Sequence, residues 1–210
     1  MNNLKSLIKS HMLQNKRVYI LLTSCLAAGA VLGSIFASVL TAAKDEQLLN
    51  YFNTFFSAYT IQSGNPHAIF TAAFLNNLTA VWYIWLSGFF VFAIPFILFQ
   101  VGLKGFKAGF IAAFLIKSYA FRGFLFAFFG LAPANLLLIP AMLAYSALNI
   151  NFAVKIYKER KQRIRKSYLL SAAKRSTLTL ACMLLILAVC GAIEGYIIPV
   201  LLKPVCSLFI

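Results

Sequence analysis

The chain has 210 residues, of which 62% are hydrophobic and only 11% are charged. About a quarter of the residues would be charged in a soluble domain of this length. The composition therefore excludes a soluble globular protein and predicts an all-α, polytopic integral membrane helical bundle. The net charge of +15 then has to be explained by where the basic residues lie.

Five apolar segments approach or exceed the roughly 20 residues needed to cross a hydrocarbon core about 30 Å thick. We expect a single transmembrane domain, residues 1–210, with five transmembrane helices at about residues 18–43, 74–103, 105–120, 123–153 and 176–202. The first run is longer than the apolar region of a signal peptide, so it is expected to remain as a helix. The third segment is short and carries lysines near its ends, which makes a re-entrant loop the alternative.

Small residues recur at four-residue spacing in three of these segments. Helices in lipid associate where small residues allow their backbones to approach closely. The glycines with this spacing are Gly29, Gly33, Gly105, Gly109, Gly191 and Gly195. They predict tight helix packing, and they leave self-association as a homodimer open.

The longest loop expected outside the membrane covers residues 44–73. Its first part has apolar side chains at i, i+4, i+7 and i+11, which predicts a short amphipathic helix lying in the membrane interface. The residues of this face are Leu48, Phe52, Phe55 and Tyr59. The helix is interpreted either as a lid on the bundle or as a docking surface for another membrane protein. Asn65 is the expected N-cap of the next helix, with Pro66 at its first position.

Catalytic and metal-binding patterns are scarce. Outside the membrane the acids, bases or ligands are Asp45, Glu46 and His67, whereas a catalytic zinc usually has three protein ligands. The sequence contains no Walker motif, no GxSxG and no HExxH, and its four cysteines form no CxxC pair. We therefore predict a non-enzymatic protein without a metal or other cofactor.

Charge distribution predicts the orientation. With five spans and a cytoplasmic N-terminus, 15 basic residues lie inside, including Lys104, Lys107 and nine in the basic loop 154–175, and four lie outside. This asymmetry follows the positive-inside rule and places the C-terminus outside. The basic loop would face the anionic inner leaflet of the bilayer, at about 1 kcal/mol per basic residue. A cytoplasmic partner is an alternative, whereas no recognised module supports nucleic-acid binding.

Prolines and one amide mark irregular places in the spans. Pro95 in the second span, and Pro133 and Pro140 in the fourth, each remove a backbone donor and are expected to bend a helix. Asn135 lies between the last two and is a candidate to bond the carbonyls that they leave free.

Glu194 is an acid within the fifth span. It lies nine residues before Lys203, roughly 13 Å from the outer end at 1.5 Å per residue. Intramembrane acids are functional candidates by default. By depth, its expected partners are Asn135, Lys117 and Arg122. Interhelical hydrogen bonding, with the carboxyl at least partly protonated, and coupling to a partner both remain open.

Three motifs occur in order along the chain: "GLKGFKAGFIAAF", "GLAPANLLLIPAM" and "GAIEGYIIPVLL". Together with the length and the basic loop, they resemble the stage II sporulation protein M family of endospore-forming bacteria. In the wider family the fourth span often contains Pro-His-Gly-x-x-Glu. Here Ala134 and Asn135 follow Pro133, and Leu138 stands at the acidic place, so the second acid is missing.

The resemblance implies a non-enzymatic role in engulfment of the forespore by the mother-cell membrane. The protein would be a multi-pass anchor in the bacterial cell membrane, on the mother-cell side of the septum. It would recruit the peptidoglycan hydrolases sporulation proteins P and D, an amidase/endopeptidase and a lytic transglycosylase. The opposing hypothesis is a permease-like subunit that moves a small or lipidic substrate with a separate ATPase.

Overall fold

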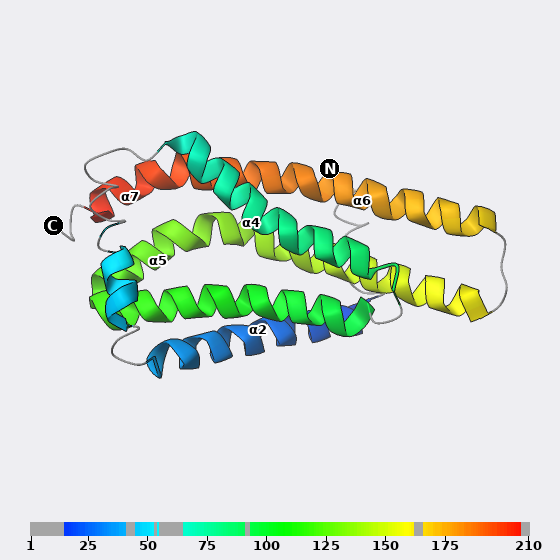
Figure 1. Ribbon diagram of the computed structural model, residues 1–210, viewed down its shortest axis with the longest axis horizontal. Coiled ribbons are helices and arrows are strands. Elements are labelled where there is room, and N and C mark those ends of the chain that lie inside the picture. Colours follow the sequence, from blue (N-terminus) through cyan, green and yellow to red (C-terminus); the bar gives the residue numbers. More distant parts are fainter. Residues whose placement is uncertain are drawn as a thin grey trace.

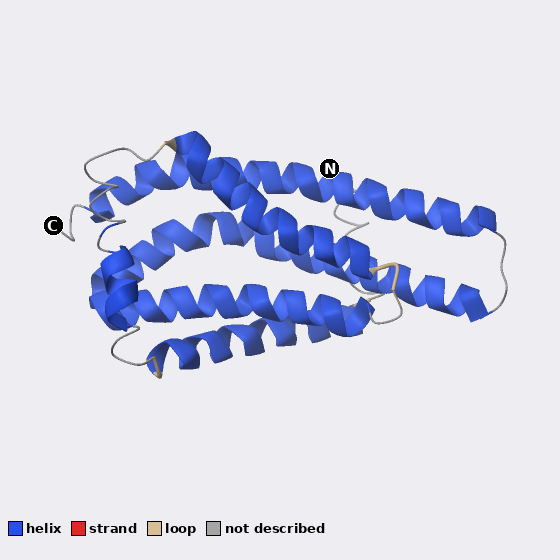
Figure 2. Cartoon of the chain, in the orientation of Figure 1, coloured by secondary structure: helices blue, strands red, loops and turns tan. Residues whose placement is uncertain are grey.

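The computed structural model describes residues 15–40, 45–52, 54, 65–90, 93–161 and 166–206, and these residues form helices joined by short turns, without a strand (Figure 2). The helical elements are α2 (Lys16–Ser38), α4 (Pro66–Ser87), α5 (Ala93–Lys161), α6 (Lys166–Ala192), the π-helical segment η1 (Ile193–Ile197) and α7 (Ile198–Cys206). The prediction of an all-helical bundle is confirmed. The chain is a membrane-embedded helical protein.

The number of separate spans differs from the prediction. Within the described residues, four helical stretches are long and apolar enough to cross a membrane: Lys16–Ser38, Pro66–Ser87, Ala93–Tyr157 and Lys174–Pro204. Five separate membrane-spanning helices are therefore not found. The difference has two causes: a turn inside the predicted second span, and the continuation of α5 across the predicted boundary between the third and fourth spans.

The first cause is a turn inside the predicted second span, 74–103. α4 ends at Ser87, the Gly88 N–H bonds to the Trp85 carbonyl at 3.2 Å, and α5 begins at Ala93. The residues around this turn are as apolar as the helices that flank it, so hydropathy did not reveal it. Pro95 consequently lies in the first turn of α5, where its missing N–H costs no hydrogen bond, and it does not bend a span.

The second cause is a sharp reversal within α5. Ala120 has φ 48° and ψ −124°, and the chain folds back there into a first arm, residues 93–119, and a second arm, residues 121–161. The two arms lie side by side and run in opposite directions (Figure 1). A Cβ added to Gly123 would overlap the carbonyl of Leu115, so the second arm leaves the reversal against the backbone of the first. The predicted third segment is thus the outer part of a long arm, not a re-entrant loop.

Glycines join α2 to the first arm of α5. On each helix, added Cβ atoms would overlap backbone carbonyls of the other. The pairs are Gly29 with Gly102, Gly33 with Phe106, Gly105 with Leu26, and Gly109 with Ala30. The two backbones are therefore in direct contact, and this glycine face of each helix is already occupied within the chain.

Two apolar clusters fill the bundle. The larger one joins α2, α4, both arms of α5, and α6 through fully buried side chains such as Leu22, Ile84, Ile97 and Leu187. A smaller one lies near the reversal and includes Leu115, Phe126, Ile198 and Leu202. Large apolar side chains such as Leu32, Leu136 and Leu185 are exposed instead, as expected for helices whose outer faces contact lipid.

Candidate functional site

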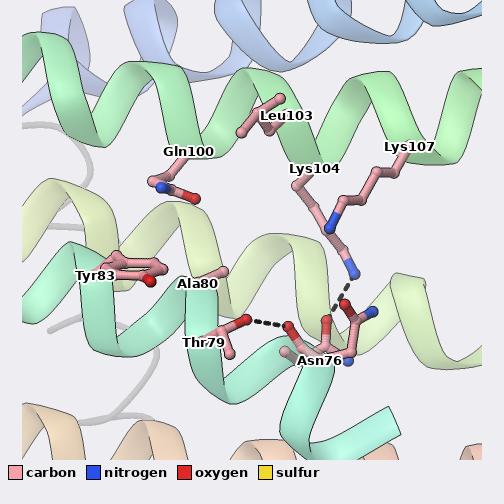
Figure 3. A pocket seen from close by; sticks show the side chains of 9 residues that line it. Asn76, Thr79, Ala80, Tyr83, Gln100, Leu103, Lys104 and Lys107 are labelled. Atoms are coloured by element: carbon pink, nitrogen blue, oxygen red, sulfur yellow. Dashed lines mark hydrogen bonds between the residues drawn. The ribbon is translucent and has the colours of Figure 1, made fainter. Parts of the chain in front are cut away.

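A polar pocket lies between α4 and the first arm of α5, near the middle of both helices. Gln100, Lys104 and Lys107 are spaced i, i+4 and i+7, so they share one face of the arm. Asn76, Asn77, Thr79 and Tyr83 of α4 lie opposite, around a cavity of about 220 Å³ (Figure 3).

Lys104 is held by a direct hydrogen bond across this pocket. Its Nζ donates to Asn77 Oδ1 at 2.8 Å, and Asn77 Nδ2 donates to the Ala73 carbonyl of its own helix at 3.0 Å. Asn77 is buried. Because an ammonium inside an apolar bundle is costly without an acceptor, this amide both orients Lys104 and stabilises its charge.

Glu194 approaches the same region from a third element. It lies in η1, a π-helical turn in which the Ile198 N–H bonds to the Ile193 carbonyl, five residues earlier. The residue after Ile198 is Pro199, which has no N–H to donate. Gly195 brings η1 against α4, since a Cβ there would lie 2.8 Å from the Pro66 carbonyl. η1 also contacts α5, the helix that carries Lys104.

Two of the three residues expected as partners of Glu194 are bonded to other groups. Lys117 forms an ion pair with Asp45 at 2.7 Å and also donates to the Ala37 carbonyl at 3.4 Å. Asn135 donates to the Leu131 carbonyl in its own helix at 2.9 Å. Arg122 is exposed beside the reversal of α5.

Sequence reasoning missed this pocket because it counted Lys104 and Lys107 as inner-side charges, at the inner end of the predicted third span. That placement followed from the misplaced boundary of the second span. The missing signal was helical periodicity: Gln100, Lys104 and Lys107 share one helix face, and a pair of asparagines occurs in the preceding apolar helix.

The predicted docking face is only partly described. Residues 45–52 and 54 are helical, and Phe52 stacks on the fully buried Phe114 with ring centroids 5.6 Å apart. Leu48 is half-buried. Phe55 and Tyr59 lie outside the described residues. Phe52 thus packs inward, as the lid interpretation expects, whereas Tyr51 is 67% exposed.

The helix that follows begins as expected. The Asn65 side chain accepts a hydrogen bond from the His67 backbone N–H at 3.1 Å, and Pro66 occupies the first helical position. Near this end of α4, Gly191 lies against the ring of Phe70, and an added Cβ would be 3.3 Å from it. The fifth-span glycines therefore face α4 of the same chain.

Metal ligands do not gather in the described part of the chain, where no group of three or more His, Cys, Asp or Glu side chains could hold a metal ion. The absence of a metal or other cofactor remains a prediction.

Comparison with known protein families gives a match. Residues 22–199 match the family described as Stage II sporulation protein M. The matched region runs from α2 to the start of α7 and so includes Asn77, Lys104 and Glu194. No match was found among curated proteins or among solved structures.

Proposed function

Because the chain belongs to the stage II sporulation protein M family and is a sporulation-related membrane protein, we propose that it acts as a non-enzymatic scaffold. In this role it recruits and localises septal peptidoglycan hydrolases while the mother-cell membrane engulfs the forespore. The proposed partners, taken from the family resemblance, are sporulation proteins P and D.

The observation that carries this proposal is the attachment of the helix that begins at Asp45. Its apolar side is anchored to the bundle through the Phe52–Phe114 stack and the Lys117–Asp45 ion pair. Its other side is exposed and carries Glu46, Gln47, Asn50, Tyr51 and Thr54. A polar face with an exposed aromatic ring, on a helix whose other side packs on the bundle, suits protein docking, since tyrosine supplies large contact area at low entropic cost.

The proposed topology puts this face outside the cell. If both arms of α5 cross the membrane, the chain crosses five times. Four basic residues near the N-terminus and nine from Lys155 to Arg175, thirteen in all, lie inside, against four outside. In this topology Lys104 and Lys107 lie within the membrane, so they are not counted among the basic residues of the loops. The excess of basic residues on the inner side remains.

The test is affinity purification of the tagged full-length protein from sporulating membranes. Tyr51→Ser should release sporulation protein P without lowering the membrane level of the scaffold. Tyr157→Ser, which alters another exposed tyrosine at the opposite end of the bundle, should retain it. Phe52→Ser should instead reduce the level of the scaffold, because it removes a ring that packs on Phe114. Unchanged recovery of the hydrolase with Tyr51→Ser would contradict docking through this face.

A permease-like subunit is the second candidate function. It is favoured by the pocket containing Lys104 and Lys107, because ionisable side chains within membrane spans often mark substrate pathways. Recovery of an ATPase, rather than cell-wall hydrolases, in the same purification would favour it.

A further inference from the structure

The pocket between α4 and the first arm of α5 carries two positive charges. Both lysine side chains reach from α5 toward α4 (Figure 3), and the charges of Lys104 and Lys107 interact with each other. Lys104 bonds to Asn77. Lys107 has no hydrogen bond or ion pair with the rest of the described chain. Among the described residues, the Asn77 amide is thus the one bonded acceptor for two ammonium groups.

We propose that this pocket binds an anionic phosphate group. The ammonium groups would neutralise its charge, and the side-chain amides of Asn76 and Gln100 can donate to its oxygens. A cavity of about 220 Å³ greatly exceeds the roughly 30 Å³ that one water occupies in the liquid, so a phosphate group fits. Two sources share this chemistry: the headgroup of an anionic phospholipid and inorganic phosphate.

Access to the pocket is open at the surface of the bundle. Asn76, Thr79, Tyr83 and Lys107 are all exposed. Tyr83 lies four residues before the end of α4 at Ser87, about 6 Å along the helix axis. A line of polar groups therefore runs from near the inner end of α4 to the two lysines, which a headgroup of the inner leaflet can follow.

The exposed position of Lys107 argues that this surface is covered in the membrane. A lysine that faces lipid deep in a bilayer is costly, and an anion seated beside it removes that cost. A second copy of the chain, packed through the same surface, is disfavoured as the cover because it would bring its own lysines against Lys104 and Lys107. The site is independent of the scaffold role proposed above.

The test uses the full-length protein in detergent with two probes. Retention of phosphatidylglycerol relative to phosphatidylcholine is measured by native mass spectrometry. Stabilisation by inorganic phosphate relative to chloride at equal ionic strength is measured as a change in Tm. The test variant is Lys107→Gln, which alters an exposed, unbonded side chain and should fold normally. The matched control is Lys155→Gln, an exposed lysine farther along α5.

We expect wild type and Lys155→Gln to bind one of the probes, and Lys107→Gln to bind it about tenfold more weakly, the scale of one charge-assisted hydrogen bond. Selective retention of phosphatidylglycerol identifies a lipid headgroup as the source. Stabilisation by phosphate without a lipid preference identifies a free anion. The proposal is overturned if wild type binds neither probe, if Lys107→Gln binds like wild type, or if Lys155→Gln weakens binding equally.

Discussion

Glu194 lies in an element that contacts both α4 and α5. It lies in a π-helical turn, a feature often found at functional sites, and the neighbouring Gly195 allows α4 to approach η1 closely. The η1 segment contacts α5 as well, and Lys104 of α5 bonds to Asn77 of α4. An acid in an apolar helix is thus placed in an element that packs against two other helices.

Replacing Glu194 separates hydrogen bonding from ionisation. Glu194→Gln keeps the shape and the hydrogen-bonding capacity, so we expect nearly normal stability and engulfment. Glu194→Ala loses both and should lower the free energy of unfolding by about 1 kcal/mol, the scale of interhelical hydrogen bonds in membranes. The measurements are thermal unfolding in detergent and microscopy of engulfment.

A different outcome would show that the charge itself is needed. If Glu194→Gln blocks engulfment as completely as Glu194→Ala while both proteins accumulate normally, a purely structural role is excluded. Lys104 would then be the first residue to examine for a charge-paired mechanism. Lys117 would be the matched control, because its ion pair is with Asp45.

At the scale of elements, the reversal in α5 decides how the bundle is assembled. Ala120 adopts a positive φ with ψ −124°, a sparsely populated conformation for a residue with a Cβ, which costs roughly 1–3 kcal/mol. Contacts between the arms must offset that cost. Gly123 contributes by letting the second arm leave the reversal directly against the Leu115 carbonyl.

We expect Gly123→Ala to destabilise the protein by at least about 1–3 kcal/mol, the usual cost of overpacking, because the group it meets is backbone and cannot rotate away. The matched control is Gly130→Ala in the same arm, where an added Cβ would lie 3.6 Å from Leu202. That change should be neutral or stabilise by up to about 1 kcal/mol, since alanine favours helix over glycine. Equal unfolding temperatures for the two variants would contradict the close packing at the reversal.

The sequence allowed some elements to be predicted because their signals are local. Asn65 and Pro66 specify the start of α4 by capping chemistry alone, and the predicted boundary between residues 120 and 123 coincides with the reversal. The turn after Ser87 was missed, since the residues there are as apolar as a span. That boundary error put Lys104 in a loop between two predicted spans. The pocket was missed as a result, and its two sides meet only through the packing of α4 against α5, which no local pattern indicates.

The outer helix shows a second limit of periodicity. The spacing of Leu48 and Phe52 correctly indicated an amphipathic helix, but an apolar face is equally suited to a partner or to the chain's own bundle. The buried Phe114 decides between them for Phe52, and no pattern within the loop itself indicates that contact.

For the whole molecule, the distribution of charge agrees with the arrangement of the helices. The second arm of α5 and the start of α6 extend past the other helices at one end of the bundle (Figure 1), where the basic residues from Lys155 to Arg175 are concentrated. The helix that begins at Asp45 and the reversal at Ala120 lie at the other end. A membrane between these ends would place the basic extension inside the cell.

The number of crossings made by α5 gives a decisive topological prediction. Its 69 residues would extend about 100 Å as a straight helix, more than three times the hydrocarbon core, so we expect each arm to cross separately.

In a cysteine-free background, single cysteines at Gln47 and Ser207 should be labelled by an impermeant reagent from outside, and one at Gln162 should be protected until the membrane is opened. Gln47 is exposed, whereas Gln162 and Ser207 lie outside the described residues. If α5 crossed only once, the pattern after Gln47 would reverse: Gln162 would be labelled and Ser207 protected. Labelling of Gln162 from outside would therefore refute two crossings by α5.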